Sequence, residues 1–383
     1  MSLYCDYNST TPVAEEVFAA MRPYLEEFYG NPSSLHQPGQ KTGLAREESR
    51  RKFAEFIGVS PGEVVFTGSG SEANCLAVRG LAQTLEGDIK ILTTRGEHSS
   101  LQLCFDHLER RGAEILRAPL ERDGAPRVEW FEENIDNSVD LISVMAASNE
   151  TGVLYPVREI AEVAADYENC LFHVDAVQIP GKIPLRPTVE RADLVSISAH
   201  KFRGPKGVGI LAARDEVVLS PLVFGHQENE IRGGTENIPG IVGAARAVDL
   251  IDCEQFKKIE ELRETTEEII LHRLAGVHIT GRTCRRLPNT SGLFIKGVEG
   301  DELVMKMDRA GYYLSAGSAC SSGVSTPSSG IRAVLPGADG YRADSFVRIS
   351  LSLGSGENEV KKFAEDFCEA AKKLRHFNGE ARG

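Results

Sequence analysis

A short stretch around Lys201 constrains the fold of this chain more than any other. Residues 193–198, Asp-Leu-Val-Ser-Ile-Ser, read as a buried strand, and His200 and Lys201 follow it before a Gly-Pro turn at residues 204–205. In an open α/β sheet, ligands bind beyond the carboxyl ends of the strands. A lysine that is partly desolvated there has a lowered amine pKa and becomes a nucleophile toward aldehydes. The alternative is a surface lysine just past a strand.

A second strand-like run, residues 171–178, carries Asp175 near its end. A strand-end aspartate and a strand-end lysine together fit an electron-sink cofactor. The lysine would form a Schiff base, and the aspartate would pair with a pyridinium nitrogen. The alternative for Asp175 is a helix cap or a turn residue.

Three motifs carry a resemblance to a known family. They are His173-Val-Asp-Ala-Val-Gln178, Ser198-Ala-His-Lys201 and Gly204-Pro-Lys-Gly207. Together they resemble class V pyridoxal-phosphate enzymes of the NifS/IscS cysteine desulfurase group, and the resemblance covers essentially the whole chain. It implies pyridoxal 5′-phosphate as the cofactor and an aminotransferase-like α/β fold of type I.

The same resemblance implies two domains. The large domain, residues 13–255, would hold the cofactor on a mainly parallel seven-stranded sheet. Residues 1–12 and 256–383 would form a smaller α+β domain that carries the nucleophile. A chain of 383 residues is itself too long for one ordinary core, which also favours two domains.

Composition narrows the class of protein. Hydrophobic residues make up 41% and charged residues 26%, as in globular proteins, and no apolar run approaches the ~18 residues of a membrane span. The start lacks a signal-peptide pattern, so we expect a cytoplasmic protein. A net charge of −13 argues against bulk nucleic-acid binding. The eight cysteines form no Cys-x-x-Cys pair, so we expect no metal site.

Strands and helices alternate along the first two thirds of the chain, which predicts a mostly parallel sheet with right-handed crossovers. Strands are expected at 63–67, 90–94, 141–145, 171–178 and 193–198, and later at 292–296 and 345–350. Helices are expected at 13–28 with Thr11 as the cap, 41–57 ending at Gly58, 157–167, 238–253, 255–274, 300–311 and 357–375.

The segment Gly68-Ser-Gly70-Ser71-Glu-Ala73 lies between a strand and a helical run. Free backbone N–H groups and the helix dipole make such a turn an anion site. It also matches Gly-x-Gly-x-x-Ala, a weak dinucleotide pattern, and it could be only a tight turn. The family resemblance instead places the cofactor phosphate here. It assigns cofactor contacts to Gly70, Ser71, Gln178, Ser198 and His200, and to Thr235 reaching across from a second subunit.

Other site residues also follow from the resemblance. His98 would stack on the cofactor ring and transfer protons, and Asn149 would contact the ring-oxygen region and the substrate. Asn31, in a Gly-Asn-Pro-Ser turn, would line the substrate side, and the Arg348 fork suits the substrate carboxylate. The alternatives are an ordinary loop histidine for His98, a cap or turn residue for Asn31 and a salt-bridged strand arginine for Arg348. Ser9, where relatives usually have Ala, is a small departure from the family pattern.

Cys320 differs in context from the other cysteines. It lies in Ser-Ala-Gly-Ser-Ala-Cys-Ser-Ser-Gly, a Gly/Ser-rich segment typical of an exposed loop. The resemblance makes Cys320 the persulfide-forming nucleophile, and the loop length up to Ser329 fits the NifS/IscS group. The chain ends soon after Arg375, without the longer tail of IscS relatives, which leaves scaffold docking open.

The expected function is therefore desulfuration of L-cysteine to L-alanine, with sulfur passed to Cys320 and Lys201 moving the α-proton. The implied partners are L-cysteine, a second copy of the chain in a homodimer with a shared active site, and an iron–sulfur scaffold protein as candidate acceptor. Transamination, or β-elimination from cysteine or selenocysteine, would need Lys201 and Asp175 without Cys320. A non-catalytic sulfur carrier is a third alternative, against which the intact Lys201 counts.

Overall fold

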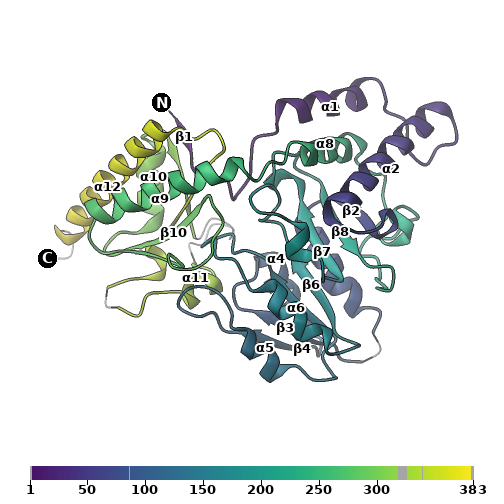
Figure 1. Ribbon diagram of the computed structural model, residues 1–383, viewed down its shortest axis with the longest axis horizontal. Helices are drawn as coiled ribbons and strands as arrows, with labels where there is room; N and C mark the ends of the chain where they lie inside the picture. The colour runs from purple at the N-terminus through teal and green to yellow at the C-terminus, as the bar shows by residue number, and fades with distance from the viewer. Residues whose placement is uncertain (1, 86, 318–325, 339, 381–383) are drawn as a thin grey trace.

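The computed structural model describes residues 2–85, 87–317, 326–338 and 340–380, with side chains up to residue 377. The described residues form two bodies, each built around its own sheet (Figure 1). The larger body holds a seven-stranded sheet. The smaller one holds a four-stranded sheet with α9 (Gln255–Arg273), α10 (Gly300–Asp308) and α12 (Glu357–Glu380) beside it.

The large sheet has the order β2-β8-β7-β6-β5-β3-β4. Its strands are β2 (Val64–Thr67), β3 (Lys90–Thr94), β4 (Glu114–Ala118), β5 (Leu141–Met145), β6 (Leu171–Asp175), β7 (Leu194–Ser198) and β8 (Gly209–Ala213). Only β8 runs antiparallel to its neighbours, and the other pairs are parallel. The prediction of a mainly parallel seven-stranded sheet is confirmed.

Helices cover both faces of this sheet. They are α1 (Glu15–Glu26), α2 (Gln37–Ile57), α3 (Gly70–Cys75), α4 (Ser99–Glu109), α5 (Val128–Asn134), α6 (Val157–Ala165), α7 (Arg186–Val189) and α8 (Ile238–Asp249). Along β2, Val64 and Phe66 join one buried cluster while Val65 joins the other, because side chains alternate between the faces of a strand. Strands covered on both faces read as nearly continuous apolar runs, and all five residues of β5, β7 and β8 are buried.

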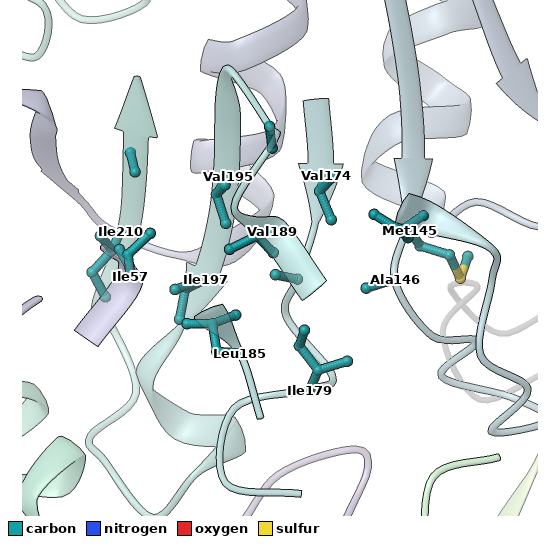
Figure 2. Packing of buried hydrophobic residues seen from close by; sticks show 14 of the residues in the cluster. Ile57, Met145, Ala146, Val174, Ile179, Leu185, Val189, Val195, Ile197 and Ile210 are labelled. Atoms are coloured by element: carbon teal, nitrogen blue, oxygen red, sulfur yellow. The ribbon is translucent and has the colours of Figure 1, made fainter. Parts of the chain in front are cut away.

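Figure 2 shows part of the larger cluster. Ile210, Val195 and Val174, from three adjacent strands, belong to the same buried cluster as Ile57 at the end of α2 and Val189 of α7. This packing fixes the strands relative to one another. Their carboxyl ends, where the predicted site residues lie, are therefore held by the core.

The small body contains the antiparallel sheet β12-β13-β10-β9 and a pair of strands, β1 and β11. Its elements are β1 (Leu3–Tyr4), α9 (Gln255–Arg273), β9 (Val277–Ile279), β10 (Thr290–Ile295), α10 (Gly300–Asp308), β11 (Tyr312–Tyr313), β12 (Ser315–Ala316), α11 (Ser329–Ala333), β13 (Phe346–Ser350) and α12 (Glu357–Glu380). Leu3 and Cys5 share its core with Phe363 of α12. The domain boundaries at residues 12/13 and 255/256 stay a prediction.

The structure corrects one helix start. The first helix begins at Glu15 with Ala14 as its N-cap, so Thr11 is not the cap. The Thr11 hydroxyl instead donates to the His200 carbonyl and accepts from the Arg203 amide, which ties the N-terminal segment to the turn after β7. The end of α2 at Gly58 is as predicted, with φ +93°, a left-handed conformation that glycine adopts without strain. Within the described part of the chain, no helix has the apolar length that crossing a lipid bilayer requires.

Candidate active site

Two neighbouring cavities lie at the carboxyl ends of the central strands. The inner cavity, of about 290 Å³, is lined by residues that include Gly70, Ser71, Gln178, Ser198 and Lys201. The outer cavity, of about 480 Å³, is lined by residues that include Glu97, Glu150, Gly317, Thr326 and Ser328. Ser9, His98, Asn149 and Arg348 line both. A larger cleft elsewhere, of about 620 Å³, contains none of the predicted site residues.

Lys201 lies in the single turn, Ala199–Lys201, that directly follows β7. Its Nζ donates to the backbone carbonyls of Asn8 at 2.7 Å and Ser9 at 2.8 Å. Lys201 lines the inner cavity, so its amine is held by these two carbonyls at the place where a ligand would bind.

Asp175 ends β6 and is 6% exposed. One carboxylate oxygen accepts from the Val177 amide at 3.0 Å, and the other accepts from the Asn74 side chain at 2.7 Å. Asp175 does not itself line the inner cavity, but Asn74 and Val177 do. The carboxylate is thus held rigidly directly behind the cavity wall.

The start of α3 approaches the end of β7 closely. A Cβ added to Gly70 would lie 2.8 Å from Val177 Cγ2 and 2.9 Å from Ser198 Cβ, so only glycine fits here. Ser69 caps the helix by accepting from the Glu72 amide at 3.1 Å. The first N–H groups of a helix have no intrahelical partner, so the predicted anion turn has donors to offer.

His98 is the N-cap of α4, and its Nδ1 lies 3.2 Å from the Ser100 amide, which donates to it. The neutral ring therefore carries its proton on Nε2. Burial lowers the pKa of His98, and Lys201 lowers it further, while Asp175 raises it. The ring is neutral near pH 7 and can donate from Nε2.

Arg348 in β13 is 7% exposed and reaches from the small body to both cavities. Its guanidinium donates to the Asn149 carbonyl at 2.9 Å, to the Ser9 hydroxyl at 2.7 Å and to Asp6. Its Nε is buried without a partner among the described residues. The cation is therefore held at the wall that the two cavities share.

Of the other predicted residues, some line the inner cavity and others do not. Asn149, Gln178 and His200 line the inner cavity, and burial lowers the pKa of His200 to about 4. Asn31 is exposed, with its side-chain oxygen accepting from the Ser33 amide, and Thr235 is also exposed. Neither lines the inner or the outer cavity. Cys320 lies outside the described residues.

Sequence reasoning missed two carboxyls of the outer cavity, the buried Glu97 and the half-buried Glu150. Burial raises the pKa of Glu97 to about 8 and that of Glu150 to about 7. The Glu150 carboxyl accepts from the Ser328 hydroxyl at 2.8 Å, and Ser328 in turn caps α11. Glu150 thereby ties the turn after β5 to the small body. The neighbouring Asn149 was predicted, but a burial that depends on distant segments leaves no local signal at Glu150.

Comparison with known proteins gives a consistent result. The model of the family "Aminotransferase class-V" matches residues 3–363. The cysteine desulfurase IscS of Dictyoglomus turgidum is 40% identical over 337 residues, which cover 87% of this chain and 85% of that protein.

Two solved structures resemble the fold. A NifS-like protein has a TM-score of 0.89 and 34% identity, covering 97% of this chain and all of that one. A structure described as SspA in complex with cysteine has a TM-score of 0.80 and 31% identity, covering 91% and 99% of the two chains. The expected aminotransferase-like fold is confirmed. Because the family model matches nearly the whole chain and the curated relatives are 40% identical, this chain belongs to the class V aminotransferase family, within the cysteine desulfurase group.

Proposed function

We propose that this protein binds pyridoxal 5′-phosphate in the inner cavity and converts L-cysteine to L-alanine, passing sulfur to Cys320 as a persulfide. The single observation that carries the proposal is the convergence of Lys201, His98, Asn149 and Arg348 on the two connected cavities, with Asp175 fixed behind the wall. These residues come from both bodies of the fold and are far apart in the sequence, so only the tertiary structure brings them together.

The residues of the inner cavity fit this cofactor. The glycine contact at Gly70 and the donors at Ser71, Ser198 and His200 suit a phosphate. The buried, anchored carboxylate of Asp175 suits a protonated ring nitrogen, and the amine of Lys201 suits an aldehyde carbon. When bound, pyridoxal phosphate supplies an electron sink that stabilises negative charge at the substrate α-carbon.

The chain's own groups then have separate tasks. Arg348 binds the substrate carboxylate, and Asn149 lies on the same wall. Lys201 Nζ takes the proton from the substrate α-carbon, and His98, which lines both cavities, is a second proton-transfer group.

The sulfur step needs a thiolate. The Cys320 thiolate attacks the sulfur of the substrate and the carbon–sulfur bond breaks. The carbon product then takes up one proton at its β-carbon and receives the α-proton back from Lys201 to become alanine. The balance is one cysteine and one thiol giving one alanine and one persulfide. Supporting this role, the described residues Gly317 and Thr326, on either side of the segment that holds Cys320, both line the outer cavity.

We also propose a homodimer in which Thr235 contributes to the partner's phosphate site. Thr235 is exposed and does not line the inner cavity of its own chain. Arg232 and Glu236, on either side of it, pair with Glu72 and Arg46. The neighbouring loop holds three successive residues with positive φ, Glu228, Asn229 and Glu230, and the Glu228 carboxylate is anchored by Arg50. A monomer that is fully active at low concentration would contradict this arrangement.

An iron–sulfur scaffold as sulfur acceptor remains a prediction.

One assay tests the proposed reaction. The purified protein is incubated with L-cysteine, and alanine, sulfide, pyruvate and protein-bound persulfide are measured together. Desulfuration predicts alanine and persulfide in step. Pyruvate with sulfide and no persulfide would move the assignment to a β-eliminating lyase.

A further inference from the structure

Lys182 is a buried lysine behind the inner cavity. It follows Gly181 in the turn after β6 and is 3% exposed. Its Nζ donates to Asn8 Oδ1 at 2.9 Å and to Gln178 Oε1 at 2.8 Å, and no carboxylate partner appears among the described residues. Burial lowers the pKa of Lys182 well below its usual range, and Lys201 and Arg348 lower it further. Burying such a group without a counter-charge is costly, so its presence calls for a role.

The two contacts determine which way the Gln178 carboxamide points. An amine with hydrogens directed at both neighbours must face oxygen atoms, because a side-chain NH₂ in either place would oppose it with a second donor. Gln178 Oε1 is therefore turned toward Lys182, and Nε2 is turned away from it. One Nε2 hydrogen is used on the Asn8 carbonyl at 3.1 Å. Gln178 lines the inner cavity, and the second hydrogen has no acceptor among the described residues.

Asn8 does not depend on Lys182 in the same way. Asn8 Oδ1 also accepts from Asn289 Nδ2 at 3.2 Å, and Asn8 Nδ2 donates to Thr290 Oγ1 at 2.8 Å. These contacts orient Asn8 even without the lysine. For Gln178 Oε1, Lys182 is the one donor found within the described part of the chain. Loss of Lys182 should therefore change the orientation of the Gln178 carboxamide more than that of Asn8.

We propose that Lys182 is a positioning residue that holds the Gln178 carboxamide with its N–H donor toward the inner cavity, where that donor recognises an acceptor atom of the bound cofactor. The identity of the ligand rests on the proposed function. Without Lys182 only the contact of Nε2 with the Asn8 carbonyl would hold the carboxamide. Rotation would then present the carboxamide oxygen to the acceptor atom of the cofactor, which would lose a hydrogen bond and add a repulsion.

A double-mutant cycle tests the proposal. The variants are Lys182→Met, Gln178→Met and the double variant, and the readouts are the Kd for pyridoxal phosphate, from titration of the apo-protein, and the absorbance spectrum of the bound cofactor. Methionine keeps the length of lysine without a donor. Lys182→Met should weaken cofactor binding about tenfold and shift the spectrum. The double variant should bind no more weakly than Gln178→Met alone, because Lys182 acts through Gln178.

Lys52→Met, which removes an exposed lysine paired with Asp249, is the control for loss of a positive charge. It should bind as the wild type does. Wild-type affinity and spectrum in Lys182→Met would overturn the proposal. So would additive effects in the double variant, since they would mean that Lys182 does not act through Gln178.

A second variant keeps the test decisive if Lys182→Met does not fold. Gln178→Glu preserves the contact with Lys182 as an ion pair but presents an oxygen, instead of an N–H group, to the cavity. It should fold and lose cofactor affinity by about tenfold or more. Wild-type affinity of Gln178→Glu would contradict the proposal.

The test of Lys182 can be separated from the test of the proposed desulfuration. If the wild type binds pyridoxal phosphate but makes no alanine from cysteine, the reaction is wrong and the titrations still decide the role of Lys182. If the wild type does not bind pyridoxal phosphate, the role of Lys182 is overturned together with the cofactor.

Discussion

The inner and outer cavities share a wall but are built in different ways. The inner cavity is formed where β5, β7 and α3 end or begin, and its groups are fixed by short contacts such as that between Asn74 and Asp175. The outer cavity is lined by turns, by α4, by strands β12 and β13 of the small body and by residues beside α11. The difference fits the division of labour that the proposed function requires, in which the inner site holds the cofactor and the outer site handles the sulfur.

The largest effect should come from breaking the inner site at its centre. Lys201→Ala removes both the amine that bonds the cofactor and the group that moves the α-proton, so alanine formation should fall by about a thousandfold or more. The visible absorbance of the bound cofactor should also be lost. The matched control is Lys206→Ala, an exposed lysine in the following turn, which should behave as the wild type. Wild-type turnover by Lys201→Ala would refute the assignment of Lys201.

Breaking only the outer site should separate the two halves of the chemistry. Cys320→Ser should bind the cofactor and cysteine normally but stop persulfide and alanine formation, because a hydroxyl has a far higher pKa than a thiol and forms no persulfide. Cys253→Ser, at a half-buried cysteine that lines the separate larger cleft, is the control. Substantial alanine production by Cys320→Ser under non-reducing conditions would reject the proposed sulfur transfer.

A smaller effect is expected from removing the negative charge of Asp175 while keeping one of its two hydrogen bonds. Asp175→Asn can keep a hydrogen-bond acceptor but loses the negative charge that holds a ring nitrogen protonated. Alanine formation should fall by about a hundredfold with the cofactor still bound, as measured by absorbance and activity on the same sample. Asp193→Asn changes a carboxylate at the opposite end of the sheet, where it accepts from the Phe172 amide, and should leave the rate nearly unchanged. Near-normal turnover by Asp175→Asn would show that the charge is dispensable.

The smallest expected effect is on the pH dependence of protein stability, and it comes from Glu150 of the outer cavity. The pKa of Glu150 rises from 4.5 to about 7 on burial, so the folded protein binds this proton more tightly than the unfolded chain does. The free energy of unfolding therefore falls as the pH rises from about 4.5 to about 7, by ~3 kcal/mol at most from this group. Glu150→Gln removes that dependence while its amide oxygen still accepts from Ser328.

Thermal unfolding of the wild type and of Glu150→Gln at about pH 5 and about pH 7.5 measures this difference. The variant should gain stability relative to the wild type at the higher pH. Glu97 titrates in both proteins, so its contribution cancels. A stability difference that does not change with pH would mean that Glu150 is ionised throughout this range in the folded protein.

The sequence predicts residues that a local strand pattern positions, and it does not predict residues that only the packing of distant segments brings to the site. Lys201 and Asp175 were found because buried strands leave a clear apolar pattern and a strand end fixes the position of the next side chain. Thr11 was misassigned as a helix cap because its hydroxyl serves the distant His200 and Arg203 instead. Asn74 and Lys182 gave no local signal. One lies inside a helix and the other follows a glycine in a turn, and only the packing of distant segments makes either of them part of the site.

The central claim is that substrate sulfur moves to Cys320 while alanine is formed. It is tested most directly by a single turnover with cysteine carrying radiolabelled sulfur, followed by proteolysis and counting of the peptides. The account predicts one labelled persulfide on the peptide containing Cys320 for each alanine produced. Alanine formed with the label released as sulfide from the start, or found on a peptide without Cys320, would contradict it.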